Sequence, residues 1–241
     1  MFWKFGGYAS ISTIETLLDK PDVCLDDLLD ESDLITELKA QNAKLIDFLR
    51  DDQALEKLLR YVIAPKTPVG DTRESTPVVE KKSERNERTG VGFFAKSTRT
   101  GRSKTRELEE TDFEKREKQR LKYAYVACEI LSSEVWSISE ALMESHDHLR
   151  EFWQYIGTAA PLDSSQAGYF TKVNEALLEK KTEEMITFIK SIDGVVVDMM
   201  KHVDCPMVMD LLLKLISLEK DPGGQGIVDV CRDRKAVACI H

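Results

Sequence analysis

The sequence lacks the features that disulfide-rich, zinc-binding and membrane proteins require. Its 5 cysteines are scattered through 241 residues without a Cys-x-x-Cys pair. Such an arrangement argues against a disulfide framework and a zinc ribbon, and it favours reduced thiols. No apolar run approaches the roughly 20 residues that span a bilayer, and the first residues lack the apolar stretch of a signal peptide. These absences predict a cytoplasmic protein, present in the nucleus as well, with no membrane partner.

Catalytic and cofactor-binding motifs are also missing. There is no Gly-x-Ser-x-Gly, His-Glu-x-x-His or phosphate-binding loop, and Gly223–Gly226 lacks the preceding strand and following lysine of a nucleotide loop. The pairs His146 with His148 and His202 with Cys205 have no second pair at zinc spacing, so we interpret them as ordinary surface or core residues. We therefore expect no metal, no cofactor and no catalytic residue, and a protein that is not an enzyme.

Charge is distributed unevenly along the chain. Residues 1–63 carry 7 basic and 13 acidic side chains, residues 64–106 carry 11 and 5, and residues 107–241 carry 16 and 25. The net charges of these segments are therefore −6, +6 and −9. The acidic segments would repel a nucleic-acid backbone, and the basic one lacks the aromatic interleaving of a single-strand binder. We expect no nucleic acid as a main partner.

What the sequence has in quantity is short, leucine-rich helical segments. Residues 1–63 contain four or five of them, and Asn42 and Asp52 are the candidate N-caps of the last two. Short connections make consecutive helices antiparallel neighbours, as in HEAT and armadillo arrays. The segment Met207–Leu218 is apolar almost all round, which predicts a helix enclosed by other helices. The predicted fold is all-α, a HEAT/armadillo-like helical-repeat array.

A second helical part is expected over residues 107–229. Its first helix runs from Glu107 to about Leu131, and Asp163 or Ser164 is the expected N-cap of a later, longer one. Pro206 is expected in a first helical turn, where proline is tolerated. Val195–Val197 could form a strand, but no second strand pairs with it, so we interpret it as a β-branched patch on a buried helix.

The intervening residues 64–106 are expected to form a disordered basic insert. They hold 11 Ser or Thr residues, Pro65, Pro68 and Pro77, and few apolar groups. Thr67 and Thr76 each precede a proline and are the candidate modification sites for a proline-directed kinase. The stretch from Lys96 to Arg106 fits a plain linker, a phosphorylated segment or a nuclear-import signal, and the sequence leaves these three open.

Candidate partner-binding residues gather toward the N-terminus. Large aromatics ahead of the first helix either fold back over the end of the array or stay exposed as an anchor for a partner. The acidic run from Asp26 to Asp33 is most simply a solvated helix face, and lysines follow it. The candidate partner-binding residues are Phe2, Trp3, Phe5, Asp30, Asp33, Lys39 and Lys44.

Six stretches of the sequence, in this order along the chain, resemble the SAPS-domain family in its fungal form. They are Met1–Phe5, Asp30–Ile35, Glu37–Leu49, Tyr123–Leu131, Lys181–Lys190 and Met209–Ile216. The resemblance implies a non-catalytic regulatory subunit that binds a serine/threonine phosphatase catalytic subunit of the 2A/6 type, with further regulatory subunits as other partners. It also implies a role in cell-cycle control and nutrient signalling, and a domain of which this chain holds the N-terminal part.

The last residues are expected to depart from that family. After Asp229 the family continues with another amphipathic helix, whereas residues 230–241 show no clean helical face. Because a Val codon followed by a Cys codon can match the start of a fungal intron, we expect residues 230–241 to be an aberrant tail translated from an intron.

Another interpretation also fits a helical array. The chain would then be a helical-repeat adaptor of another kind, for cargo or trafficking. The fold permits this equally, because a fold does not fix a function. An enzyme would require a nucleophile and a base brought together from distant helices.

The predicted insert gives a first test of this organisation. Limited digestion with trypsin should cut first between Lys66 and Arg106, because few apolar groups there offset an ordering cost of about 1–2 kcal/mol per residue. Mass spectrometry of the early fragments locates the cuts. First cleavage within residues 120–218 would contradict the predicted division of the chain.

Overall fold

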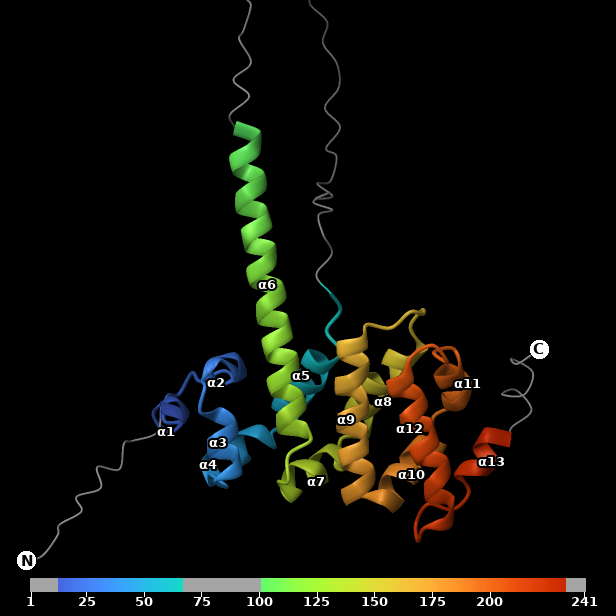
Figure 1. Cartoon of the computed structure of the whole chain (residues 1–241). Helices are drawn as coiled ribbons and strands as arrows, with labels where there is room; N and C mark the ends of the chain where they lie inside the picture. The colour runs from blue at the N-terminus through green and yellow to red at the C-terminus, as the bar shows by residue number, and fades with distance from the viewer. Residues whose placement is uncertain (1–12, 67–100, 233–241) are drawn as a thin grey trace, which may run out of the picture. The chain divides into compact units, whose positions relative to one another are not determined.

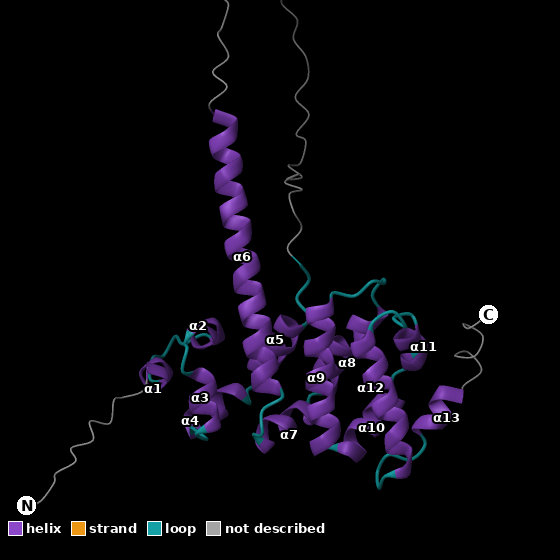
Figure 2. Cartoon of the chain, viewed as in Figure 1, coloured by secondary structure: helices purple, strands orange, loops and turns teal. Residues whose placement is uncertain are grey.

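The computed structural model describes residues 13–66 and 101–232, and all regular elements in these ranges are helices (Figures 1 and 2). The all-α prediction is thereby confirmed for the described residues. None of these helices is long and apolar enough to cross a membrane. The helices are α1 (Thr13–Leu18), α2 (Leu25–Asp30), α3 (Leu34–Lys39), α4 (Ala43–Leu49), α5 (Asp52–Val62), α6 (Gly101–Leu131), α7 (Trp136–Glu144), α8 (His146–Trp153), α9 (Ser164–Lys180), α10 (Thr182–Lys190), α11 (Val195–Met200), α12 (Pro206–Ser217) and α13 (Ile227–Arg232), with 3-10 helices η1 (Gln154–Gly157) and η2 (Leu218–Lys220).

The chain divides into two compact units. The larger one combines residues 1–64 with residues 120–241, and the smaller one comprises residues 65–119. Helix α6 starts at Gly101, earlier than the predicted start at Glu107, so the expected boundary at residue 106 falls inside a helix. Insert residues 67–100, which include the candidate sites Thr67 and Thr76, and the tail beyond Arg232 lie outside the described residues.

Local capping explains where several helices begin. The Asn42 side chain accepts a hydrogen bond from the Leu45 amide at 3.2 Å, and Asp163 accepts from the first amides of α9, as predicted. The predicted cap of α5 is wrong by one residue. Asp51 is the N-cap, and Asp52 instead accepts a hydrogen bond from Ser145 of the α7–α8 junction.

Helix α9 lies at the centre of the larger unit. It packs against α5, α7, α10 and α12, and its residue Phe170 is fully buried. The Phe170 ring lies 4.8 Å from that of Phe152 and 5.3 Å from those of Trp153 and Tyr155, measured between centroids. Edge and tilted contacts of this kind add to the burial of the rings. This aromatic cluster joins α8, η1 and α9 into one core.

Helix α12 is not enclosed in the way its sequence predicts. Its buried side, which includes Leu211 and Leu215, packs toward α9, α11 and α13, but Leu213 is 64% exposed and Met207 43% exposed. The expectation of full enclosure is therefore wrong for this chain. The expectation fails because the neighbouring helices of the described chain cover one side of α12 and leave the opposite side exposed.

The two segments of the larger unit meet where the smaller unit begins and ends. The Ala64 carbonyl accepts a hydrogen bond from the Arg120 guanidinium at 2.8 Å. The same carbonyl accepts a hydrogen bond from the Gln166 side chain of α9. Residues on both sides of the interruption are thus held at one point of the core.

Asp30 forms a second link between these segments. Its carboxylate lies 2.7 Å from the Lys122 ammonium and accepts a 3.0 Å hydrogen bond from the buried Tyr123 hydroxyl. Lys122 and Tyr123 belong to α6, whereas Asp30 ends α2. Asp30 therefore has a structural role, and it is not a free surface charge.

Replacing Asp30 should destabilise the fold in a pH-dependent way. The hydrogen bond from Lys122 and the one from Tyr123 lower the pKa of Asp30 below its usual value near 3.8. This stabilisation is therefore present above pH 3.8 and lost as the pH falls through the lowered pKa of the folded protein.

We expect Asp30→Ala to cost about 1–2 kcal/mol at pH 7, discounted for exposure, because an ion pair and a hydrogen bond are lost. This corresponds to a fall in Tm of about 2–6 °C. Asp33→Ala is the matched control and should change Tm little, since the Asp33 side chain is exposed and, within the described ranges, accepts a hydrogen bond from its neighbour Ser32 alone. Thermal melts at pH 7 and pH 3 check both variants, and equal melting of Asp30→Ala and wild type at pH 7 would contradict the link.

Candidate functional site

The predicted partner-binding residues do not form one cluster in the described part of the chain. Phe2, Trp3 and Phe5 lie outside the described residues, and Asp30 is engaged with α6. Lys44 pairs with Asp19 at 2.7 Å, which raises the pKa of the Lys44 ammonium. Of the remaining residues, Asp33 is an exposed helix start, and Lys39 borders a groove.

This groove lies between α3, the end of α6, the start of α7, and α9. Its volume is about 450 Å³, within the range of about 300–1,000 Å³ that is usual for ligand pockets. We call it the α3–α9 groove. The residues that line it are Ile35, Leu38, Lys39, Gln41, Glu129, Ser132, Ser133, Glu134, Val135 and Lys172.

Apolar and charged side chains have separate roles in the α3–α9 groove. Ile35, Leu38 and Val135 supply aliphatic surface, and Leu38 and Val135 are themselves buried. Glu129 and Lys172 pair with each other across α6 and α9. Because each of these two charges already has its partner, neither is left to pair with a bound molecule.

Two further charges border the groove without such a partner. Lys39 and Glu134 are exposed, and within the described ranges neither forms an ion pair or a side-chain hydrogen bond. They have opposite sign and come from different elements, the end of α3 and the α6–α7 connection. Their charges are therefore available to a bound molecule.

The α6–α7 connection is fixed from beneath by Lys180. The ammonium of this α9 residue donates hydrogen bonds to the Ser132 and Ser133 carbonyls. These carbonyls would otherwise be unsatisfied where α6 ends. The connection thus holds Glu134 and Val135 in a defined position at the groove.

Trp136, which starts α7, is an exposed aromatic that follows the groove residue Val135 in the sequence. Its side chain is 54% exposed, and the Lys181 ammonium lies 4.0 Å from the ring centroid. A cation at this distance from a ring is attracted to its face and restricts its motion. A large exposed aromatic therefore lies one residue along the chain from the groove lining.

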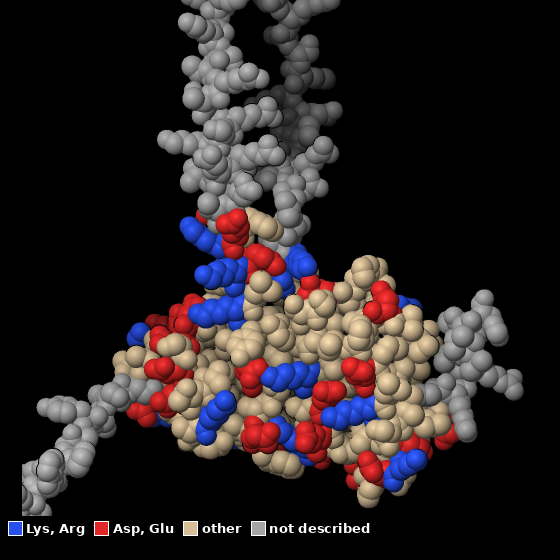
Figure 3. All heavy atoms as spheres, in the orientation of Figure 1, with Lys and Arg blue, Asp and Glu red and all other residues tan. Residues whose placement is uncertain are grey.

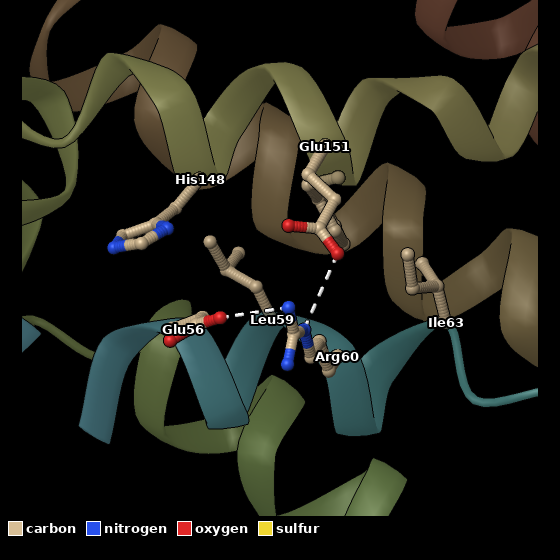
Figure 4. Close-up of a pocket in the computed structure, with 7 residues that line it drawn as sticks. Glu56, Leu59, Arg60, Ile63, His148 and Glu151 are labelled. Carbon is tan, nitrogen blue, oxygen red and sulfur yellow. Dashed lines mark hydrogen bonds and ion pairs between the residues drawn. The ribbon is translucent and has the colours of Figure 1, made fainter. Parts of the chain in front are cut away.

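A second, much smaller hollow lies between α5 and α8 (Figure 4). Its volume of about 10 Å³ is no larger than one water molecule needs. In the close-up, Arg60 of α5 reaches Glu56 on its own helix and Glu151 on α8, at 2.7 and 3.2 Å. This contact joins two helices. The hollow beside it is too small to bind a substrate.

The described residues offer no arrangement suited to metal or nucleophilic chemistry. No group of three or more His, Cys, Asp or Glu residues in these ranges could hold a metal ion. His148 pairs with Asp52, and His202 is fully buried with its Nε2 bonded to the Ile156 carbonyl at 2.8 Å. Burial raises the pKa of the Cys128 thiol to about 12, so this sulfur is not a nucleophile near neutral pH.

Charges of both signs are interspersed among uncharged side chains on the face shown in Figure 3. A nucleic-acid surface would instead gather basic side chains into a stripe or patch. The α3–α9 groove offers aliphatic side chains together with single charges of each sign.

Comparison with known proteins decides the family. The family model described as "SIT4 phosphatase-associated protein", called SAPS, matches residues 174–240. The chain is 34% identical over 234 residues to "Extragenic suppressor of kinetochore protein 1" of Schizosaccharomyces pombe, covering 95% of this chain and 23% of that protein. This chain belongs to the SAPS family.

Other relatives agree with this assignment. "SIT4-associating protein SAP190" of Saccharomyces cerevisiae is 32% identical over 88% of this chain and 23% of its own length. "Serine/threonine-protein phosphatase 6 regulatory subunit 3" of Gallus gallus is 31% identical over 92% of this chain and 20% of its own length. The SAPS chain thus spans about a quarter or less of these relatives. No solved structure matches it.

The match to the family model includes most of the segment that we expected to be an aberrant tail. It continues to residue 240, and residues 227–232 form α13. The side chain of Glu219 accepts hydrogen bonds from the Gly226 and Val228 amides, at 3.0 and 2.9 Å, where this helix begins. The aberrant tail at residues 230–241 stays a prediction, which a transcript read through this region tests.

Gln41 provides a test of the turn that borders the groove. Its φ of 61° lies in the left-handed region, which costs a residue with a Cβ about 1–2 kcal/mol and costs glycine little. Gln41→Gly should therefore keep or raise Tm, and the β-branched Gln41→Val should lower it. In the exposed middle of α5, Lys57→Gly should instead lose about 1 kcal/mol. Thermal melts compare the three, and a Gln41→Gly variant as unstable as Lys57→Gly would contradict this conformation.

Proposed function

We propose that this SAPS-family chain is part of a non-catalytic regulatory subunit that binds a serine/threonine phosphatase catalytic subunit of the 2A/6 type. One observation carries the proposal. Sequence similarity extends over 88% or more of the chain to proteins named as SIT4-associating or as phosphatase 6 regulatory subunits. Because the similarity runs through the described core, the chain has the scaffold of those proteins, and its binding surface lies on that scaffold.

The proposed scaffold is a HEAT/armadillo-like array. In the larger unit the helices that border the α3–α9 groove, α3, α6 and α9, come from every third position in the helix order, and α12 packs against α9 as the next member. A repeat of three helices would place one helix of each repeat along a common face, where extended partners bind such arrays. The proposed domains are residues 1–63 and 107–229, on either side of the basic insert at 64–106.

The proposed binding surface includes the N-terminal edge. Phe2, Trp3 and Phe5 would supply aromatic anchors, and Asp33 and Lys39 would supply charges. Asp30 and Lys44 are already paired within the chain, so they would act through the shape of the edge. We place the complex in the cytoplasm and nucleus, with roles in cell-cycle and nutrient signalling, and we propose Thr67 and Thr76 as phosphorylation sites that adjust it.

A helical adaptor without a phosphatase is the rival function. Affinity purification of the chain from its native cells, followed by mass spectrometry, separates the two. Recovery of a metallophosphatase catalytic chain supports the proposal, and its absence from a bait of full length supports the adaptor.

Trp3→Ala tests the N-terminal edge. Truncating an aromatic anchor commonly costs 2 kcal/mol or more, so we expect catalytic-subunit binding to weaken by roughly tenfold or more at unchanged helical content. Tyr8→Ala, an aromatic change outside the cluster, should bind as wild type. Pull-down and circular dichroism measure both properties. Full binding by a Trp3→Ala protein with a lowered Tm would show that Trp3 caps the array and is not an anchor.

A further inference from the structure

We propose that the α3–α9 groove is the docking site for an extended peptide segment of the phosphatase catalytic subunit. The segment would place one large apolar side chain in the groove, with an acidic residue on the Lys39 side and a basic residue on the Glu134 side. This inference rests on the proposed function and adds to it where the catalytic subunit is held and what kind of segment it presents.

The first reason is the shape and lining of the groove. About 450 Å³ is enough for a large side chain and the adjoining backbone, and the aliphatic surface of Ile35, Leu38 and Val135 favours an apolar one. The groove is built on helix ends, and its walls are tied by the Glu129–Lys172 pair and by Lys180. A partner would therefore meet a preformed surface, and little ordering cost opposes binding.

The second reason is the pattern of charge. The Glu129–Lys172 pair is satisfied internally, whereas Lys39 and Glu134 have no such partner in the described ranges. Two single charges of opposite sign suit a segment with one acidic and one basic residue, and they disfavour a partner of uniform charge. They therefore argue against nucleic acid and in favour of a peptide, and they fix the direction in which it binds.

The third reason is an exposed aromatic, Trp136, that follows the groove residue Val135 in the sequence. Trp136 is 54% exposed, whereas tryptophan side chains are on average highly buried. The Lys181 ammonium lies over its ring. Tryptophan is one of the residue types enriched at the energetic centre of protein interfaces. The exposed indole would cover the peptide backbone as it leaves the groove.

Binding of the full chain to a purified 2A/6-type catalytic subunit tests the proposal. Biolayer interferometry gives the Kd of the wild type and of Lys39→Glu, Glu134→Lys and Trp136→Ala, all at exposed positions. We expect Kd to rise by roughly tenfold or more for each, because each change removes or reverses a complementary contact near the centre of the interface. Lys220→Glu, an equal charge change at an exposed residue of η2, should bind as wild type.

Two failures of this experiment have different meanings. If the wild type does not bind the catalytic subunit, the proposed function is wrong and the docking site falls with it. If the wild type binds and the three groove variants bind equally well, only the docking site is wrong.

A photo-crosslinking group at Gln41, which lines the groove, identifies the occupant directly. We expect crosslinks to one short segment of the catalytic subunit that has an apolar residue between an acidic and a basic one. Crosslinks within the chain to residues 1–12 would instead show that its own N-terminal aromatics fill the groove, and would overturn the proposal. Circular dichroism of every variant excludes unfolding as the cause of lost binding.

Discussion

The backbone carbonyl of Ala64 is the acceptor on which the assembly of the larger unit depends. It receives hydrogen bonds from Arg120 and from Gln166, so a single partly buried polar group joins residues from both sides of the smaller unit to α9. A backbone carbonyl at the point where the chain leaves the core needs a hydrogen-bond donor. Here it is satisfied by residues distant in sequence, one on α6 and one on α9.

Local signals made the helices predictable. The Asn42 and Asp163 caps, Pro206 in the first turn of α12 and the helical assignment of Val195–Val197 are confirmed, since each depends on neighbouring residues only. The errors are of two kinds. Asp51 and Asp52 are equally good caps by sequence, and the exposure of α12 depends on which neighbours cover it.

The candidate site could be predicted only in part. Lys39 is in the predicted set and borders the groove, but Glu134, Trp136 and Lys172 are not in it, because residues that lie apart in sequence form the groove only after folding. Asp30 and Lys44 looked like free surface charges in the sequence. Their partners Lys122 and Asp19 lie on other helices, and no periodicity identifies such pairs.

The shortness of the helices determines how stability is distributed in the larger unit. Apart from α6, whose residues are divided between the two units, only α9 among the described helices is longer than 12 residues, and α1, α2, α3, α11 and α13 have six residues each. Isolated helices shorter than about 12–15 residues are marginal in water. No element of this kind keeps its conformation without its neighbours, so folding of the unit is cooperative, and a change that loosens one helix is felt by the helices beside it.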